Sequence, residues 1–126
     1  MTVDWRWPDF SPDEMRCKCG CGQVAMDSGF MDQLQGLRDI LRFPLPVTSG
    51  YRCPEHNAAV SNTGTSGPHT TGKAADIGVD RARAHTLLCV APQMFSGIGV
   101  QQKGGGRRFI HLDTLIGPAR PGVWSY

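Results

Sequence analysis

Two polar stretches that lie far apart in the chain put the strongest constraint on its fold. The first is Ser66–Asp76, which carries His69 and Asp76 among glycines. The second is Phe109–Asp113, which carries His111 inside an apolar run. Imidazole nitrogens and carboxylate oxygens are zinc donors, so these side chains form a metal site only if the fold brings both stretches together. We therefore expect a domain in which the two stretches are neighbours.

The alternation of side chains in the second stretch predicts a strand with one polar face. Residues two apart on a strand share a face, so His111 and Asp113 point to the same side. Ile110 and Leu112 then point to the opposite side, toward a core. The same rule places Asp76 on the face opposite to its apolar neighbours. The polar groups are thus expected to face a cleft.

These residues have the chemistry of a catalytic zinc site. With His69, Asp76 and His111 as ligands, one coordination position stays open for water, whose pKa falls to about 7. Asp113 is the natural general base, because it follows a ligand by two residues on the same face. The alternative is that Asp113 orients His111 through its other ring nitrogen, and both roles stay open. The pattern predicts a zinc hydrolase with one catalytic ion.

The composition is that of one small domain with many loops. A chain of 126 residues with 40% hydrophobic residues can build one modest core. Its 16 glycines and 9 prolines favour turns between short helices and strands. We expect a single domain, residues 1–126, of the α+β class, with a small antiparallel sheet and flanking helices.

Charge and hydropathy exclude two classes of partner. The 13 basic and 11 acidic residues nearly balance, so we expect no nucleic-acid binding through phosphate neutralisation. No segment approaches the roughly 18 apolar residues that cross a bilayer. Residues 1–10 also lack the basic and apolar regions of a secretory signal. We expect no membrane insertion, and synthesis in the cytoplasm without a signal peptide.

Apolar periodicity predicts the longest helix. From Met26 to Arg42 the apolar positions recur every three or four residues, which is the period of a helix with one buried face. Asp27 or Ser28 can cap its start, and Pro44 ends it. The expected apolar stripe consists of Phe30, Leu34, Leu37, Ile40 and Leu41.

Shorter elements follow from turn residues and local patterns. Residues 1–14 form an N-terminal arm whose aromatic side chains are expected to lie against the body, with a short helix capped by Ser11. The other expected elements are a strand within 45–52, a helix over 54–60, a strand over 75–79, a helix over 80–90, and a hairpin of strands 96–100 and 108–113.

The cysteines fit no simple disulfide framework. The chain has five, an odd number, so reduced thiols are the default interpretation. Cys17, Cys19 and Cys21 are separated by single residues, a spacing that is poor for two ligands on one zinc ion. Free or paired thiols in a tight loop are favoured, and a second metal site is the alternative.

Several polar residues and glycines recur in an order that resembles a known family. They are Ser49–Arg52, Asn57, Ser66, His69, Gly72, Ala74, Asp76, His111, Asp113 and Trp124. This pattern resembles the peptidase M15 family of zinc D-Ala-D-Ala carboxypeptidases and phage endolysins, over about Phe10 to Trp124. The similarity is greatest to the small M15A-like branch, which often has a Cys-Gly-rich start as well.

The resemblance implies a fold, a substrate and additional site residues. It implies a domain like those of hedgehog proteins and DD-peptidases, and cleavage of peptidoglycan stem or cross-bridge peptides. Arg52 matches the family arginine that binds a substrate carboxylate and assists catalysis, and Ser66 matches the serine that lines the site. Tyr51 is expected beside them in the substrate-binding region. Many relatives place an acid three residues before the last histidine, where this chain has Arg108.

The expected biology follows from the same resemblance. A monomeric enzyme made without a signal peptide would act on the cell wall after release or delivery, as a phage lysis protein or a virion-borne enzyme does. The alternative is a non-catalytic module, either a zinc-stabilised wall-binding domain or a phage structural piece.

Overall fold

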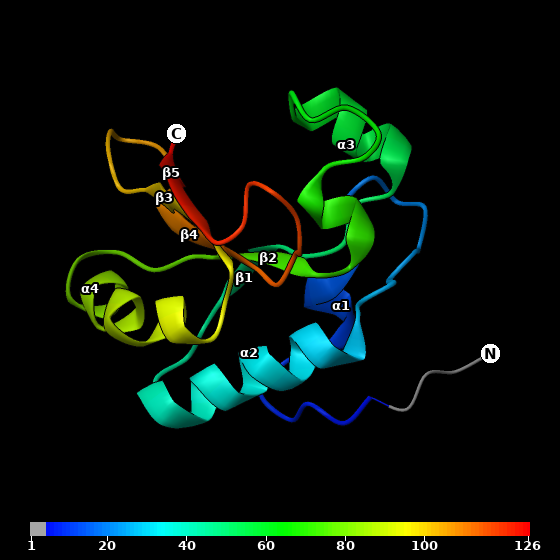
Figure 1. Ribbon diagram of the computed structural model, residues 1–126. Coiled ribbons are helices and arrows are strands. Elements are labelled where there is room, and N and C mark those ends of the chain that lie inside the picture. The colour runs from blue at the N-terminus through cyan, green and yellow to red at the C-terminus, as the bar shows by residue number, and fades with distance from the viewer. Residues whose placement is uncertain (1–4) are drawn as a thin grey trace.

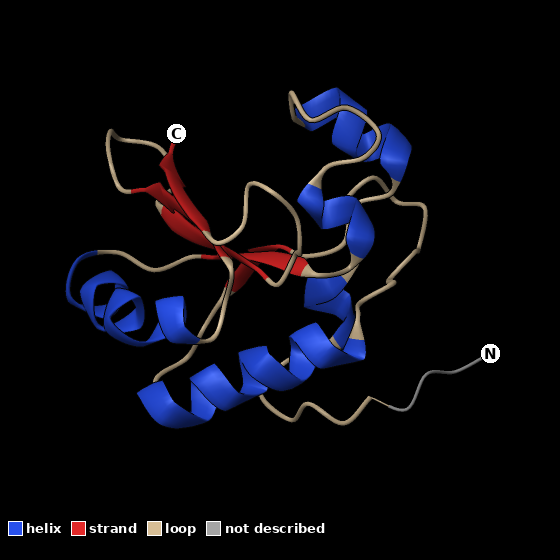
Figure 2. Cartoon of the chain, in the orientation of Figure 1, coloured by secondary structure: helices blue, strands red, loops and turns tan. Residues whose placement is uncertain are grey.

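The computed structural model describes residues 5–126, which form a five-stranded sheet with α2 and α4 on one side and α3 on the other (Figures 1 and 2). The helices are α1 (Pro12–Met15), α2 (Ser28–Leu41), α3 (Pro54–Val60) and α4 (Arg81–Val90), and 3-10 turns span Pro68–Thr71 and Ala91–Gln93. The strands are β1 (Val47–Ser49), β2 (Ala74–Ile77), β3 (Gly97–Gln101), β4 (Phe109–Asp113) and β5 (Gly122–Ser125). This arrangement confirms the α+β class.

The sheet brings the two polar stretches side by side. Its strand order is β1-β2-β4-β3-β5, so β2 and β4 are central neighbours. They pair antiparallel, with Asp76 directly opposite His111. The β3–β4 hairpin is antiparallel as predicted, and it sets Gly99 opposite His111. The register therefore places a carboxylate and an imidazole on one face at the centre of the sheet.

One strand was not predicted from the sequence, and it changes the type of the sheet. β5 pairs with β3 in the parallel direction, so the sheet is mixed rather than wholly antiparallel. A parallel pair has no hairpin turn between its strands, so no local turn signal marks this pairing. The consequence is that the C-terminal residues lie beside the polar face of β3.

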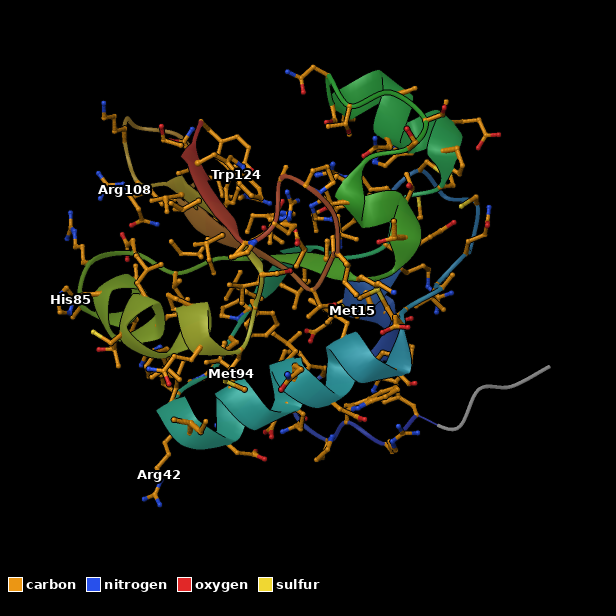
Figure 3. All side chains as sticks on the ribbon, viewed as in Figure 1. Met15, Arg42, His85, Met94, Arg108 and Trp124 are labelled. Atoms are coloured by element: carbon orange, nitrogen blue, oxygen red, sulfur yellow. The ribbon has the colours of Figure 1, made fainter. Side chains whose placement is uncertain are left out.

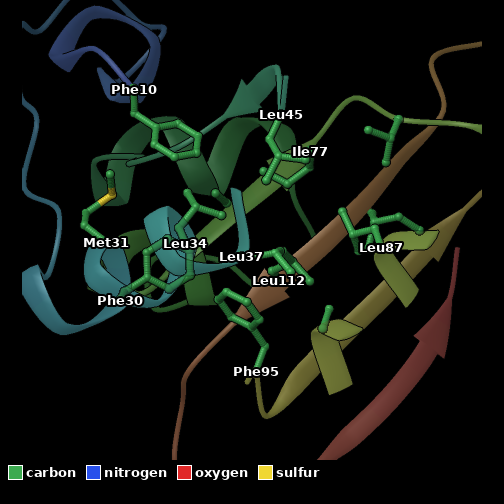
Figure 4. Packing of buried hydrophobic residues seen from close by; sticks show 14 of the residues in the cluster. Phe10, Phe30, Met31, Leu34, Leu37, Leu45, Ile77, Leu87, Phe95 and Leu112 are labelled. Carbon is green, nitrogen blue, oxygen red and sulfur yellow. The ribbon is translucent and has the colours of Figure 1, made fainter. Parts of the chain in front are cut away.

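The core lies between the opposite face of the sheet and the helices α2 and α4 (Figure 4). α2 begins at the predicted cap, where the Asp27 side chain accepts a hydrogen bond from the Phe30 amide. Ile40 does not extend the buried stripe as predicted, because it is 57% exposed. The buried core side chains include Phe30, Met31, Leu34, Leu37, Ile77, Leu87, Ile110 and Leu112.

The N-terminal segment lies along the outer side of α2 (Figure 1). Of the predicted arm, residues 1–4 lie outside the described residues, and residues 5–14 pack as expected. Trp7 and Phe10 are buried, and the Trp7 indole donates a hydrogen bond of 2.9 Å to Asp32 of α2. Ser11 caps α1 with its side chain, as predicted. Among residues 5–126, no helix has the length and apolar character needed to cross a bilayer.

Candidate metal and active site

A cavity of about 740 Å³ opens on the polar face of the sheet. His69, Asp76 and His111 lie together in its wall. Residues after α3 line one side of the cavity, and β5 and the end of the chain line the other. Figure 3 shows Trp124 of β5 on the side of the sheet that faces away from α2. The predicted cleft is therefore present, and it contains the three predicted ligands.

The three candidate ligands converge on one point. His69 Nε2 lies 3.3 Å from Asp76 Oδ1, and His111 Nδ1 lies 3.0 Å from the same oxygen. The two imidazole rings are 5.1 Å apart between centroids and lie edge to face. All three residues are buried, with exposed fractions of 2–6%. They form one of the two groups of potential metal ligands in the described chain.

The backbone around His69 fixes which ring nitrogen faces the site. His69 lies in the 3-10 turn, and its Nδ1 is 2.8 Å from the Gly50 carbonyl oxygen. If Nδ1 donates to that carbonyl, Nε2 keeps its lone pair for a metal ion. Gly72 ends the turn with φ +75°, and any side chain there would collide with the Ala25 carbonyl. The chain can therefore return from His69 to Asp76 only through a glycine at this position.

Asp113 lies directly behind His111. Its Oδ2 accepts from His111 Nε2 at 2.8 Å and from Arg120 Nη2 at 2.8 Å. Its Oδ1 accepts from Arg120 Nε at 2.9 Å and from the Leu115 amide at 3.2 Å. The side chain is fully buried and is not part of the cavity lining. These four contacts use the lone pairs that a carboxylate offers, and they hold the His111 ring in one orientation.

The electrostatics of the site favour a cation. Burial opposes ionisation of Asp76, but hydrogen bonds from His111 and His69 hold its pKa well below the usual range. Burial also opposes ionisation of Asp113, yet hydrogen bonds from His111 and Arg120 lower its pKa to about 2. For His111 burial lowers the pKa, and the two adjacent carboxylates raise it above its ordinary value. The imidazoles thus lie against carboxylates that stay ionised at neutral pH.

Arg52 lines the cavity beside the three ligands. Its Nε donates to Ser49 Oγ and its Nη1 to Asn57 Oδ1, both at 3.1 Å. Its Nη2 lies 3.7 Å from Asp76 Oδ2, which is an ion pair beyond hydrogen-bond length. Two of the three nitrogens are therefore fixed by the protein, and the third is directed toward the site.

The structure does not bring the other predicted contact residues to the cavity wall. Tyr51 is buried against Cys17 and Cys53, and Ser66 is exposed on the loop before the 3-10 turn. Neither residue is part of the cavity lining, and their contact with substrate stays a prediction. Trp124 does line the cavity, with its ring centroid 5.2 Å from that of His111.

Two parts of the site were missed by sequence reasoning. Arg120 pairs with Asp113 and also lies 4.9 Å over the Trp124 ring, but it belongs to a loop with no recognisable pattern. Gly97 lies opposite Asp113 in the β3–β4 register, and any side chain there would collide with the Asp113 carboxylate. The alternation of Gly97, Ile98 and Gly99 beside the polar face of β4 is the sequence signal that could have revealed this close packing.

Comparison with known proteins identifies one family. Residues 8–113 match the family model described as Peptidase M15. The matched region contains the three candidate ligands and Arg52, and it ends at Asp113. The comparisons with curated proteins and with solved structures gave no match.

Proposed function

Because the chain belongs to the peptidase M15 family, we propose that it is a zinc peptidase that hydrolyses peptide bonds of bacterial peptidoglycan. The observation that carries this proposal is the convergence of two histidines and one carboxylate in the wall of a large cavity. The family supports peptidase activity, and the donor set supports a metal-dependent reaction. The substrate and the ion are our proposal.

The donor set fits zinc. His69 Nε2, Asp76 Oδ1 and His111 Nδ1 would hold the ion, which is the donor set of a catalytic zinc site with an open position. When bound, zinc polarises the scissile carbonyl and lowers the pKa of a water molecule to about 7. The remote nitrogens of both histidines already have partners in the protein, namely Gly50 and Asp113. The chain therefore presents the two ligating nitrogens in fixed orientations.

We propose that Asp113 positions His111 and does not act as the general base. Its four contacts leave no lone pair directed into the cavity, and a base must reach the proton that it abstracts. Arg120 holds the carboxylate from the other side, so the pair works as a rigid support for the imidazole. This favours the second of the two roles that the sequence left open.

Arg52 supports a substrate with a carboxylate near the scissile bond. Its side chain is 16% exposed in the cavity wall, with Nη2 directed toward the candidate ligands. Arginine binds carboxylates through charge-assisted hydrogen bonds, and peptidoglycan stem peptides carry free carboxylates at D-alanine and at side-chain positions. We propose that Arg52 anchors one of these groups and so selects the bond that is cut. The enzyme would act on the wall after release or delivery.

A second candidate function is a non-catalytic wall-binding or phage structural module that zinc stabilises. The observation that favours it is the absence of a second acid in the cavity. Among the lining residues in the described chain, Asp76 is the only one with an acidic side chain, and Arg108 takes the place of the acid found in many relatives. Such a module would bind zinc and peptidoglycan but would release no fragments.

Digestion of purified peptidoglycan distinguishes the two candidates. The samples are the wild type, the chelated protein with and without added zinc, and the variants His69→Ala and Arg52→Ala. Mass spectrometry of the released peptides identifies the bond: loss of single D-alanine residues indicates a carboxypeptidase, and opened cross-links indicate an endopeptidase. We expect full digestion by the wild type and by the zinc-restored sample, strongly reduced digestion by Arg52→Ala, and no fragments from the chelated protein or from His69→Ala.

Matched controls separate the site from general damage. His85→Ala removes an exposed histidine on α4 (Figure 3), and Arg107→Ala removes an exposed arginine of the β3–β4 loop. Both should digest peptidoglycan like the wild type. Activity that survives complete metal removal would contradict a zinc peptidase. Binding without any new peptide end would favour the non-catalytic module.

A further inference from the structure

Four cysteine side chains meet outside the lining of the catalytic cavity. Cys17, Cys19 and Cys21 lie in the loop after α1, and Cys53 lies at the start of α3. All four sulfur atoms are within 4.8 Å of one another. The Sγ–Sγ distance is 3.5 Å between Cys17 and Cys19 and 3.7 Å between Cys19 and Cys53. All five cysteines of the chain are free thiols, so no disulfide accounts for this cluster.

The two short Sγ–Sγ distances match the edges of a metal tetrahedron. Four zinc–sulfur bonds of about 2.3 Å place neighbouring sulfurs about 3.8 Å apart. A disulfide would need about 2.05 Å. Four soft thiolates in a tetrahedral arrangement are a donor set typical of zinc or iron. We propose that Cys17, Cys19, Cys21 and Cys53 bind a structural zinc ion with closed, four-coordinate geometry.

The local backbone is built to gather these thiols. Gly20 and Gly22 have φ values of +91° and +81°, with open space around both, so they turn the chain twice within a few residues. The Cys17 amide donates to the Gln23 carbonyl at 2.9 Å and closes the loop. The Cys53 amide lies 3.3 Å from Cys17 Sγ, as a donor to a metal-bound sulfur would. These turns make possible the one-residue spacing that the sequence pattern disfavoured.

The proposed ion would lie directly behind the catalytic site. Cys53 follows Arg52, whose own amide donates to the His69 carbonyl at 3.1 Å. Two residues earlier, the Gly50 carbonyl holds the His69 ring. The Tyr51 amide donates to the Met15 carbonyl at 2.9 Å, so the segment 50–53 also joins the end of α1. An ion on the four thiolates would pin this segment to the N-terminal loop and so support His69 and Arg52.

The site is accessible to a metal ion and to chelators. Cys17 and Cys53 are buried, whereas Cys19 and Cys21 are exposed. The buried pair anchors the cluster to the body, and the exposed pair closes it from the solvent side. Metal binding by these thiols does not depend on peptidase activity, and a protein without that activity could still bind the ion here.

Metal content and cobalt spectroscopy test the proposal. In the reduced wild type we expect about two zinc ions per chain by elemental mass spectrometry, and about one in His69→Ala, where only the cysteine site remains intact. Replacement of zinc by Co²⁺ should give an intense sulfur-to-cobalt charge-transfer band in the near ultraviolet, which a site of nitrogen and oxygen donors lacks. The band should persist in His69→Ala and should be lost or strongly weakened in Cys19→Ser.

Cys89→Ser is the matched control, because Cys89 is an exposed cysteine on α4 outside the cluster. It should keep the cobalt band and the zinc content of the wild type. A wild type and a His69→Ala variant without the band would overturn the proposal, even if Cys19→Ser fails to fold. Fewer than five reactive thiols after the protein, purified under nitrogen, has been denatured in the presence of a chelator would indicate a disulfide and overturn it as well, as would iron in place of zinc.

Discussion

At the scale of single residues, the candidate metal centre depends on the hydrogen-bond partner that each histidine has on the side away from Asp76. In both His69 and His111, one ring nitrogen faces Asp76. The other nitrogen contacts the Gly50 carbonyl in His69 and the Asp113 carboxylate in His111. The partner of His111 is the buried Asp113, which Arg120 holds in a two-point ion pair. Such partners tune ligand orientation and basicity, so their loss should weaken metal binding.

Asp113→Asn tests this positioning role. We expect its zinc affinity to fall about 10–100-fold, because the amide cannot replace the charge that orients His111. Competition with a fluorescent chelator measures the affinity. Asp80→Asn, an exposed carboxylate at the start of α4, is the control and should bind zinc normally. An unchanged affinity combined with a lost rate at saturating zinc would instead assign Asp113 as the base.

Gly97→Ala tests the close packing around the same carboxylate. A methyl group there would collide with the Asp113 carboxyl, which β4 holds opposite Gly97. We expect a destabilisation of about 1–3 kcal/mol from overpacking, together with weaker zinc binding. Gly105→Ala lies in the β3–β4 loop with open space around it and should change neither property. Urea denaturation measures the stability, and a Gly97→Ala variant as stable as the control would contradict the register.

At the scale of elements, α2 shows how a periodic pattern becomes a core face. Four residues on its inner side are buried against the apolar face of the sheet. On its outer side, Asp32 and Gln35 form hydrogen bonds with the N-terminal segment. The pattern predicted the helix and its cap correctly. It did not predict that Ile40, at the edge of the stripe, is 57% exposed.

Two aliphatic residues of α2 give a matched pair for this argument. Leu34→Ala should cost about 2–5 kcal/mol, because Leu34 is fully buried and its loss leaves a cavity. Ile40→Ala should change the stability by no more than about 0.5 kcal/mol, because Ile40 is 57% exposed. Urea denaturation midpoints measure both. Equal effects of the two substitutions would contradict the assigned face of the helix.

At the scale of the whole molecule, one core joins the N-terminal segment, the helices and the sheet. Trp7 and Phe10 belong to the same buried cluster as the strand residues Ile77 and Leu112 (Figure 4 shows Phe10). The segment 5–14 is therefore part of the cooperative fold and not an appendage. Its continuation is the cysteine loop, which links it to the segment that carries Arg52.

Phe10→Ala should therefore destabilise the entire domain. We expect a loss of about 3–5 kcal/mol, because a large aromatic side chain leaves the core. Thermal unfolding followed by circular dichroism should show a single transition at a lower midpoint. Ile116→Ala is the control, because Ile116 is 99% exposed. A Phe10→Ala variant with the midpoint of the control would mean that the N-terminal segment contributes little to the fold.

The sequence by itself determined most of the elements and named the candidate ligands, because apolar periodicity, caps and strand alternation are local rules. Apolar periodicity and caps define α2, and strand alternation puts His111 and Asp113 on one face of β4. The residues from Ser66 to Asp76 also carry their own turn, since Gly72 alone permits the return toward β2. The α+β class followed from these elements and from the resemblance to the family.

Only the tertiary structure decided which distant groups meet. The parallel pairing of β5 with β3, the ion pair of Arg120 with Asp113, and the approach of Cys53 to the cysteine loop all join segments without a local signal. These three interactions form only in the folded chain, so no short segment of the sequence predicts them. The ion pair with Arg120 also favours one of the two roles that the sequence left open for Asp113, because the role of a carboxylate depends on which donors occupy its oxygens.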